Sequence, residues 1–352
     1  MDSQVFVALS GGVDSAVCAC LLKEKYKHVV GISHVVWPES KCCTKICLDR
    51  AAKQCQELGL PYYRIVCISE FSKCVIDPFV NNYLSGLTPN PCVLCNQHIR
   101  FDFMLKEAYS KYADKFTKDY KISTGHYAKV QKENDWFYLC KGVDAAKDQS
   151  YMLYRLNQEQ LARCEFPLGD YTKAQVRELA SKMNLESAQE KDSQDICFIT
   201  GSHQDFIEGY SHQKPVQGNL VSLQGEVLGT HKGIHAYTRG QRKGLKLSGG
   251  PWYVVKIDVE KNEVILGRKE DLEVKKFFIN NINWLFTNQP KIITCMVQTR
   301  YHAKEVKCQV EFLSNQEALV ELSEPSIDVS PGQSAVFYEN DYVLGGGIVF
   351  FK

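Results

Sequence analysis

A short glycine turn, residues 10–15 with the sequence SGGVDS, constrains this chain more than any other feature. The apolar run at 5–9 predicts a buried strand before the turn, and the small apolar residues at 16–22 predict a buried helix after it. Glycines let the backbone come close to an anion, and free N–H groups at a helix N-terminus bind phosphate. The turn therefore predicts a phosphate site, with Asp14 and Ser15 in the first helical turn, where capping residues belong.

The same turn excludes one common phosphate loop. GxxxxGK[ST] needs a lysine after its glycines, and none follows here. SGGVDS instead resembles the PP-loop of the ATP pyrophosphatases, which split ATP between the α and β phosphates and adenylate an oxygen of their substrate. The plain alternative is a capped strand-to-helix turn that binds no ligand.

Composition limits the class of protein. A chain of 352 residues is long enough for two or three domains. It contains no apolar run of about 20 residues and no signal-peptide pattern, so we expect a cytoplasmic protein without a membrane span. The net charge is only +1, yet residues 227–257 hold six basic side chains and no acid. That run is either a solvated face or a contact for nucleic-acid phosphates.

Fifteen cysteines in such a chain indicate thiol chemistry or metal binding rather than disulfides. Most, including Cys18 and Cys55, lie in apolar patterns and are expected in the core. Cys92 and Cys95 differ, because they lie in the proline-rich segment 88–96, TPNPCVLCN. We expect a rigid, extended loop there, followed by a helix from about Gln97 whose N-terminus lowers the thiol pKa.

Alternating strands and helices up to about residue 205 predict a mostly parallel sheet covered on both faces. The expected strands are 5–9, 29–36, 62–68 and 121–124, and the expected helices are 16–24, 47–58, 71–84 and 101–112. Ligands bind such sheets at the carboxyl ends of strands, so 33–34 and 124–126 are expected beside the SGGVDS turn. From about 206 onward, short strands and glycine turns predict two small β barrels or sandwiches.

Eight motifs occur in the order found in tRNA-specific 2-thiouridylases, and the chain resembles that family over essentially its whole length. They are SGGVDS, TPNPxxxCN, STGHY, KDQSY, SQDICFI, GQRKGL, TRY and PGQSAVFY. The resemblance implies an α/β PP-loop domain of the adenine-nucleotide α-hydrolase type at 1–205. It also implies a small central β domain at 206–276 and a C-terminal β-barrel domain at 277–352, both contacting tRNA.

The resemblance also implies an activity, ATP-dependent 2-thiolation of the wobble uridine (position 34) of tRNA. Adenylation of O2 precedes transfer of sulfur from a cysteine persulfide, and AMP and pyrophosphate are the by-products. In this scheme Cys197 carries the persulfide. Cys95 is the nucleophile, and it ends in a transient Cys95–Cys197 disulfide.

Further site residues follow position by position from the resemblance. The ATP site is matched by Ala8, Leu9, Ser10, Gly11, Gly12, Val13, Asp14, Ser15, His34 and Gly125. The target base is matched by Asn90, Pro91 and Cys92. Contacts with tRNA are matched by Lys147, Asp148, Gln149, Arg300 and Tyr301, and the basic residues Arg239, Arg242 and Lys243 are further candidates.

The expected cofactors are ATP and Mg²⁺, and the expected partners are tRNA, of the lysine, glutamate and glutamine type, and a sulfur donor such as a cysteine desulfurase or relay protein. Many family members have aspartate where this chain has Cys92, which leaves the acid/base role of that position open. Cys92, Cys95 and Cys197 could alternatively hold an iron–sulfur cluster as the sulfur carrier.

Two other functions stay open on the residues alone. One is a PP-loop ligase or amidotransferase acting on a small metabolite, which would not need the basic run or the C-terminal β region. The other is a non-catalytic RNA-binding protein with a relic nucleotide site.

Overall fold

The computed structural model describes residues 4–38, 40–41, 43–112, 119–189 and 196–352, and these form two compact units. The first unit comprises Met1–Val75, Cys92–Thr200 and Asn340–Val343. The second comprises Ile76–Pro91, Gly201–Glu339 and Leu344–Lys352. The segment Ile76–Pro91 therefore groups with the β-rich half of the chain, although it lies within the expected 1–205 domain.

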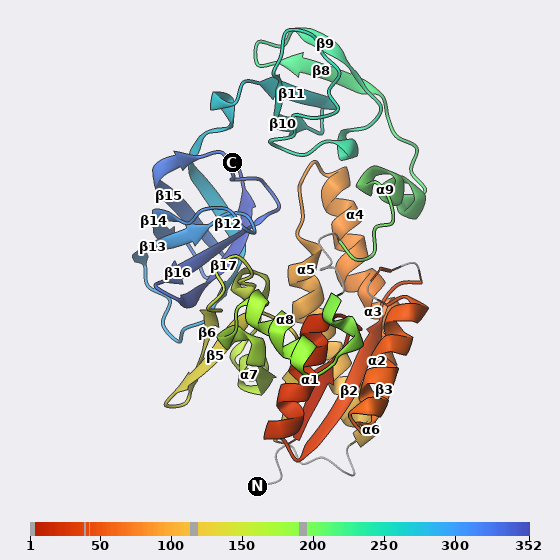
Figure 1. Ribbon diagram of the computed structural model, residues 1–352. Coiled ribbons are helices and arrows are strands. Elements are labelled where there is room, and N and C mark those ends of the chain that lie inside the picture. Colours follow the sequence, from red (N-terminus) through yellow and green to blue (C-terminus); the bar gives the residue numbers. More distant parts are fainter. Residues whose placement is uncertain (1–3, 39, 42, 113–118, 190–195) are drawn as a thin grey trace. The chain divides into compact units, whose positions relative to one another are not determined.

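A five-stranded parallel sheet is the centre of the first unit, as the alternating pattern predicted (Figure 1). The strand order is β3-β2-β1-β4-β7. The strands are β1 (Gln4–Ala8), β2 (His28–Val35), β3 (Tyr62–Val66), β4 (Tyr120–Ser123) and β7 (Cys164–Glu165). Because β1 pairs in parallel with both β2 and β4, the carboxyl ends of these three strands meet at one edge, where the SGGVDS turn begins.

Three main helices of this unit begin within three residues of the predicted positions: α1 (Val13–Lys25), α2 (Lys45–Glu57) and α6 (Met104–Tyr112). The unit also contains α7 (Gln158–Arg163) and α8 (Lys173–Lys182). Helix α1 packs against α8, and its small residues Val17, Cys18 and Ala19 are fully buried in the core beside Cys55. These cysteines are core residues, as predicted.

Two predicted helices are segmented differently in the structure. The stretch expected at 71–84 divides into α3 (Ile68–Phe71), a π-helical turn η1 (Ser72–Ile76) and α4 (Asp77–Leu84). The helix expected from Gln97 begins six residues earlier, as α5 (Pro91–Leu94) followed by the π-helical segment η2 (Cys95–Phe103). The expectation of an extended loop around Cys92 and Cys95 is therefore wrong, because Pro91 starts a helix instead of preventing one.

A β-hairpin in the first unit was not predicted from the sequence. It consists of β5 (Ala128–Glu133) and β6 (Trp136–Lys141), joined by a turn with Asn134 in the left-handed region at φ 54°. The remaining short helical turns are η3 (Ser150–Leu153), η4 (Pro167–Asp170) and η5 (Glu186–Gln189). Several charged residues in the hairpin strands obscure their alternation in the sequence.

The central β region of the second unit is a four-stranded sheet with the order β10-β11-β8-β9. Its strands are β8 (Gly218–Ser222), β9 (Val227–His231), β10 (Tyr253–Asp258) and β11 (Glu263–Gly267). Leu220, Val254 and Val264 form its small core. Helix α9 (His203–Ser211) precedes the sheet, capped by Ser202, and two 3-10 turns, η6 (Ile234–Ala236) and η7 (Glu270–Leu272), lie within and after it.

Six strands form a closed barrel at the end of the chain, with β12 pairing with β17 to complete the order β12-β15-β14-β13-β16-β17. They are β12 (Val274–Trp284), β13 (Ile292–Gln298), β14 (Val306–Phe312), β15 (Glu317–Ser326), β16 (Ser334–Glu339) and β17 (Tyr342–Phe350). The expected domain boundary at 276/277 falls inside β12. Exposed Lys275 and Lys276 open that strand, so its start resembled a polar linker in the sequence.

No helix among the described residues combines the length and apolar character needed to span a membrane.

Candidate nucleotide and sulfur-transfer site

The SGGVDS turn has the backbone geometry of an anion-binding strand-to-helix connection. Gly11 lies in the left-handed region at φ 76°, and a Cβ placed there would meet the carbonyl oxygen of Cys47 at 2.6 Å. Gly12 is the N-cap of α1 and has no side chain with which to cap the helix. Asp14 and Ser15 lie in the first turn of α1, as predicted, although neither is the N-cap residue. The first N–H groups of the helix are therefore positioned to bind an anion.

Serines at the two ends of the turn close it with hydrogen bonds. The Ser15 hydroxyl donates to the Gly12 carbonyl at 3.0 Å and accepts from the Ser10 backbone N–H at 3.2 Å. Ser15 is buried, whereas Ser10 is exposed at the mouth of the turn. The two serines therefore fix the shape of the loop through internal hydrogen bonds, and the outer face of the loop is accessible to a ligand.

Asp14 is held by two residues that the sequence analysis missed. Both carboxylate oxygens accept hydrogen bonds from the Lys173 ammonium, at 2.7 and 2.8 Å, and Oδ1 also accepts from the Tyr127 hydroxyl at 2.7 Å. Thr172 and Gln175 form a capping box at the start of α8, whose first residue is Lys173. No local pattern, however, relates that helix to a carboxylate 159 residues earlier.

Residues at the ends of the neighbouring strands meet the turn as predicted. The Ser33 hydroxyl of β2 donates to the Leu9 carbonyl at 2.6 Å. Gly125, just after β4, lies against the first turn of α1, where an added Cβ would be 3.0 Å from the Ser15 nitrogen and from the Asp14 side chain. Of the expected ATP-site residues, 8–15 and Gly125 are therefore contiguous in space.

Two buried histidines lie near the same edge, on β2 and after β4. Burial lowers the pKa of His34 to about 3, and the positive charge of Arg100 on η2 adds to the effect. The pKa of His126 is lowered to about 3 by the same two causes, and its Nδ1 lies 2.5 Å from the Thr124 hydroxyl. Both imidazoles are therefore neutral near pH 7, and His126 is a satisfied polar residue at a strand end.

The three cysteines singled out by sequence differ in exposure. Cys92 on α5 is exposed, Cys95 at the start of η2 is buried, and Cys197 is half-buried. The Lys41 N–H donates to the Cys197 carbonyl at 2.7 Å, and the following Phe198 packs edge-on against Phe71. Residues 193–195 of the SQDICFI motif lie outside the described part of the chain.

Among the described residues, no group of three His, Cys, Asp or Glu side chains is arranged to hold a metal ion. The iron–sulfur alternative and the Cys95–Cys197 disulfide both stay predictions.

The expected base-contacting segment is anchored within the second unit by the PGQSAVFY motif. The Thr88 N–H donates to the Pro331 carbonyl at 2.9 Å, and the Gln333 amide donates to the Thr88 carbonyl at 2.8 Å. Gly332, at φ 88°, approaches so closely that a Cβ would lie 2.9 Å from the Thr88 nitrogen. Thr88 and Gln333, which are 245 residues apart, thus belong to one local structure that leads into Asn90 and Pro91.

The expected tRNA segment 147–149 has a structural task as well. Asp148 accepts hydrogen bonds from Gly142 and Ser150, and burial raises the pKa of its carboxyl group. Gln149 forms two hydrogen bonds with the backbone of Tyr127, donating from its N–H at 2.8 Å and accepting through its side chain at 3.1 Å. Since the Tyr127 hydroxyl bonds to Asp14, segment 147–149 is connected to the nucleotide turn.

The basic candidates in the second unit fall into two kinds. Arg300, exposed, and Tyr301, half-buried, follow β13, and Arg242 and Lys243 are also exposed, so all four could meet a polyanion. Arg239 is half-buried, and its guanidinium donates to the carbonyls of Val329 and Leu272 at 2.7 and 2.8 Å. That arrangement links the η7 turn to the segment before β16, so Arg239 has a stabilising role whatever it does with RNA.

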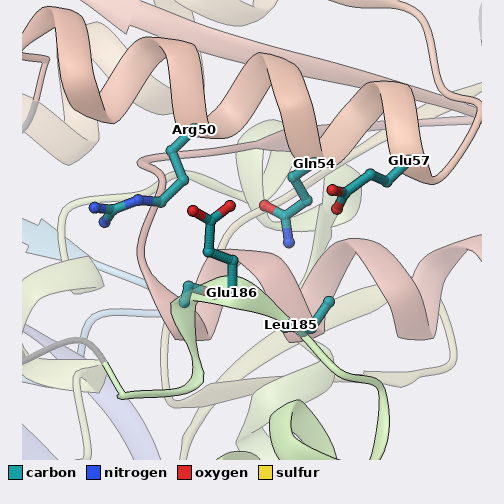
Figure 2. A pocket seen from close by; sticks show the side chains of 6 residues that line it. Arg50, Gln54, Glu57, Leu185 and Glu186 are labelled. Carbon is teal, nitrogen blue, oxygen red and sulfur yellow. The ribbon is translucent and has the colours of Figure 1, made fainter.

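A solvent-open hollow lies between α2 and the segment around Leu185 and Glu186 (Figure 2). Arg50, Gln54 and Glu57 line it from α2, and Leu185, Glu186 and Ser187 line it from the facing segment. Glu186 also pairs with Lys53 at 2.8 Å. The hollow is connected to the turn through Arg50, whose guanidinium donates to the Gly11 carbonyl at 3.4 Å.

Comparison with known proteins places these features in a family. Residues 3–201 match the model described as tRNA methyl transferase HUP domain. Residues 204–268 match its PRC-barrel domain and 274–349 match the aminomethyltransferase beta-barrel domain. Fold and turn thus define a PP-loop nucleotide-binding protein of the HUP class with two β domains appended.

Curated relatives narrow this class. A protein named tRNA-specific 2-thiouridylase MnmA from Geobacter metallireducens is 40% identical over 98% of this chain and 96% of its own length. Another of that name from Moorella thermoacetica is 41% identical over 97% and 98%. The chain belongs to the tRNA-specific 2-thiouridylase family.

A solved structure, the U34-tRNA thiolase NcsA from Methanococcus maripaludis with its [4Fe-4S] cluster, is a much more distant match. Its TM-score is 0.35 at 20% identity, covering 60% of this chain and 65% of that one. At that level its cluster says nothing about the cysteines of this chain.

Proposed function

We propose that this protein is an ATP-dependent tRNA sulfurtransferase that converts the wobble uridine of tRNA to 2-thiouridine, releasing AMP and pyrophosphate. The observation that carries the proposal is the SGGVDS turn at the start of α1, in a chain similar over almost its full length to named tRNA 2-thiouridylases. An α-β split of ATP needs such a backbone cradle for the phosphates.

The first half-reaction is adenylation of the uridine. O2 attacks the α-phosphorus of ATP, the bond from that phosphorus to the bridging oxygen breaks, and its electron pair leaves with pyrophosphate. The free N–H groups of α1 bind the phosphates and offset the negative charge that develops on the leaving group. Asp14 offers carboxylate oxygens of the kind that Mg²⁺ prefers, and the ion would supply further charge neutralisation there.

The second half-reaction transfers sulfur. We assign a persulfide to Cys197, whose terminal sulfur attacks C2; the C2–O2 bond then breaks and AMP leaves carrying O2. Cys95 attacks the inner sulfur, the persulfide bond breaks, and a Cys95–Cys197 disulfide remains. A dithiol reductant must then return both thiols. Cys95 is buried in the structure, so the step requires the sulfur segments to rearrange when tRNA binds.

The partners follow from this scheme. We propose tRNAs for lysine, glutamate and glutamine as substrates, and a cysteine desulfurase or sulfur-relay protein as the donor to Cys197. The exposed side chains Arg242, Lys243 and Arg300 supply phosphate contacts of the required charge.

Pyrophosphate release measured with and without unmodified tRNA tests the function. The proposal predicts release that depends on tRNA, together with tRNA binding that weakens steeply as salt is raised. A metabolite ligase would release pyrophosphate without tRNA once given its substrate. A relic nucleotide site would bind tRNA and release none. Either of those results would overturn the proposal.

A further inference from the structure

Lys173 provides a positive charge beside the SGGVDS turn, which contains no basic residue of its own. The turn has no lysine after its glycines, yet the pyrophosphate that leaves ATP carries several negative charges. Lys173 is the first residue of α8, and its ammonium reaches the carboxylate of Asp14 in the first turn of α1. Two helix N-termini and one lysine therefore meet where the phosphates are expected.

The surroundings of Lys173 hold it firmly in this position. Its backbone N–H donates to Asp144 Oδ2 at 2.8 Å, and the Thr172–Gln175 capping box fixes the start of its helix. Its side chain is only 11% exposed, and its ammonium lies 5.9 Å from the centre of the Tyr127 ring. An ammonium so far removed from water is strong in electrostatic terms, because little solvent screens it.

Asp14 and Lys173 neutralise each other while the turn holds no nucleotide. A buried charge without a partner is costly, so pairing with Asp14 explains how Lys173 can be stable in the site before a nucleotide binds. The flexible four-carbon stem lets the ammonium turn toward a phosphate when one arrives.

We propose that Lys173 is a catalytic residue that contacts the β-phosphate of ATP and stays with pyrophosphate as it leaves. This role rests on the proposed adenylation of tRNA. As O2 bonds to the α-phosphorus, the bridging oxygen takes the electron pair of the broken bond. The Lys173 ammonium stabilises the resulting charge by hydrogen bonding, and no proton needs to be transferred. Lys173 thus supplies from α8 the positive charge that a P-loop lysine supplies from within its own loop.

Product binding separates this role from a structural one. In the presence of magnesium, calorimetry would measure the dissociation constants of inorganic pyrophosphate and of AMP for the wild type and for Lys173→Met. We expect the Kd for pyrophosphate to rise about tenfold, the usual value of one charge-assisted hydrogen bond, and the Kd for AMP to change less than about twofold. The tRNA-dependent release of pyrophosphate should slow by about a hundredfold.

Three further variants make the test decisive. Lys182→Met removes an exposed lysine of the same helix and should change nothing. Tyr127→Phe removes one hydrogen bond to Asp14 without removing a charge, so its effect on pyrophosphate affinity should be well below that of Lys173→Met if Lys173 acts directly. Lys173→Arg keeps the charge and should recover part of the affinity, and it takes the place of Lys173→Met if that variant does not fold.

Equal weakening of AMP binding and pyrophosphate binding in Lys173→Met would overturn the assignment and leave Lys173 a structural role. A loss of pyrophosphate affinity in Tyr127→Phe as large as that in Lys173→Met would do the same. If wild-type enzyme forms no 2-thiouridine, the proposed function fails. If it forms 2-thiouridine and Lys173→Met binds pyrophosphate normally, only the role of Lys173 fails.

Discussion

Gly125 lies against Asp14 so closely that an added Cβ would be 3.0 Å from the Asp14 Cβ and 3.0 Å from the Ser15 nitrogen. A contact that tight leaves the neighbour no room to accept a methyl group without moving. Asp14 belongs to the first turn of α1, whereas Gly125 follows β4. The end of one strand therefore sets the position of the helix N-terminus that faces the phosphates.

Gly125→Ala should weaken ATP binding by about tenfold, because overpacking of this kind costs about 1–3 kcal/mol and displaces the first turn of α1. Equilibrium binding of a non-hydrolysable ATP analogue measures the effect. Gly209→Ala on α9 is the matched control, since a Cβ there meets nothing within 4 Å. Unchanged ATP affinity in Gly125→Ala would show that the turn tolerates movement of α1.

Gly11→Ala should abolish measurable ATP binding, with a loss of about a hundredfold or more. Its φ of 76° is unfavourable for alanine, and the new Cβ would lie 2.6 Å from the Cys47 carbonyl oxygen. Gly59→Ala separates these two causes, because Gly59 has φ 65° and open space around it. Gly59→Ala should lower the unfolding midpoint slightly and leave ATP binding intact. ATP binding by Gly11→Ala within threefold of the wild type would contradict this account of the turn.

Cys92→Ser tests the persulfide scheme against an iron–sulfur cluster. Cys92 is exposed on α5, and the persulfide scheme gives it no bond to form or break. We expect thiolation within about threefold of the wild type, since serine keeps a small polar side chain at this exposed position. Protein purified without oxygen should then carry no stoichiometric iron. Iron together with visible absorption, both lost in Cys92→Ser along with activity, would support the cluster instead.

The nucleotide half of the site could be predicted from sequence because its signals are local. SGGVDS lies between a buried strand and a buried helix; β1 begins one residue before its predicted start and α1 begins three residues before its predicted start. The parallel sheet follows from the alternating pattern, which also explains why Ser33 and Gly125 reach the turn.

Contacts between distant segments could not be predicted. Nothing in the local sequence relates Lys173 to Asp14, or Gln333 to Thr88, because these pairs form only when separate elements pack. Pro91 is the opposite case, because a local residue pattern there predicts the wrong structure. A proline was interpreted as keeping the chain extended, but at the first position of α5 its missing N–H costs nothing and it begins a helix.

His34→Gln and His126→Gln should each flatten the dependence of stability on pH. Both imidazoles have a folded-state pKa of about 3, below the usual value of 6.5. Between those values the unfolded chain binds protons that the folded protein does not, so stability is full above pH 6.5 and falls as the pH drops toward 3. Each of the two histidines should lower the free energy of unfolding of the wild type by about 1 kcal/mol between pH 7 and pH 5.5.

Urea unfolding of the first unit at pH 7 and pH 5.5 measures that slope, with exposed His28→Gln as the control. If the free energy of unfolding of His34→Gln or His126→Gln changes with pH as much as that of the wild type, the replaced imidazole is already protonated, or already solvated, in the folded protein.

Nucleoside analysis of tRNA tests the central claim most directly. Unmodified tRNA would be incubated with the protein, ATP, magnesium and a persulfide donor, and the digested nucleosides would be separated and weighed by mass spectrometry. The account predicts 2-thiouridine at the wobble position with one AMP per modified uridine, and none with folded Cys197→Ser. Absence of 2-thiouridine with the wild type, or normal thiolation by Cys197→Ser, would contradict it.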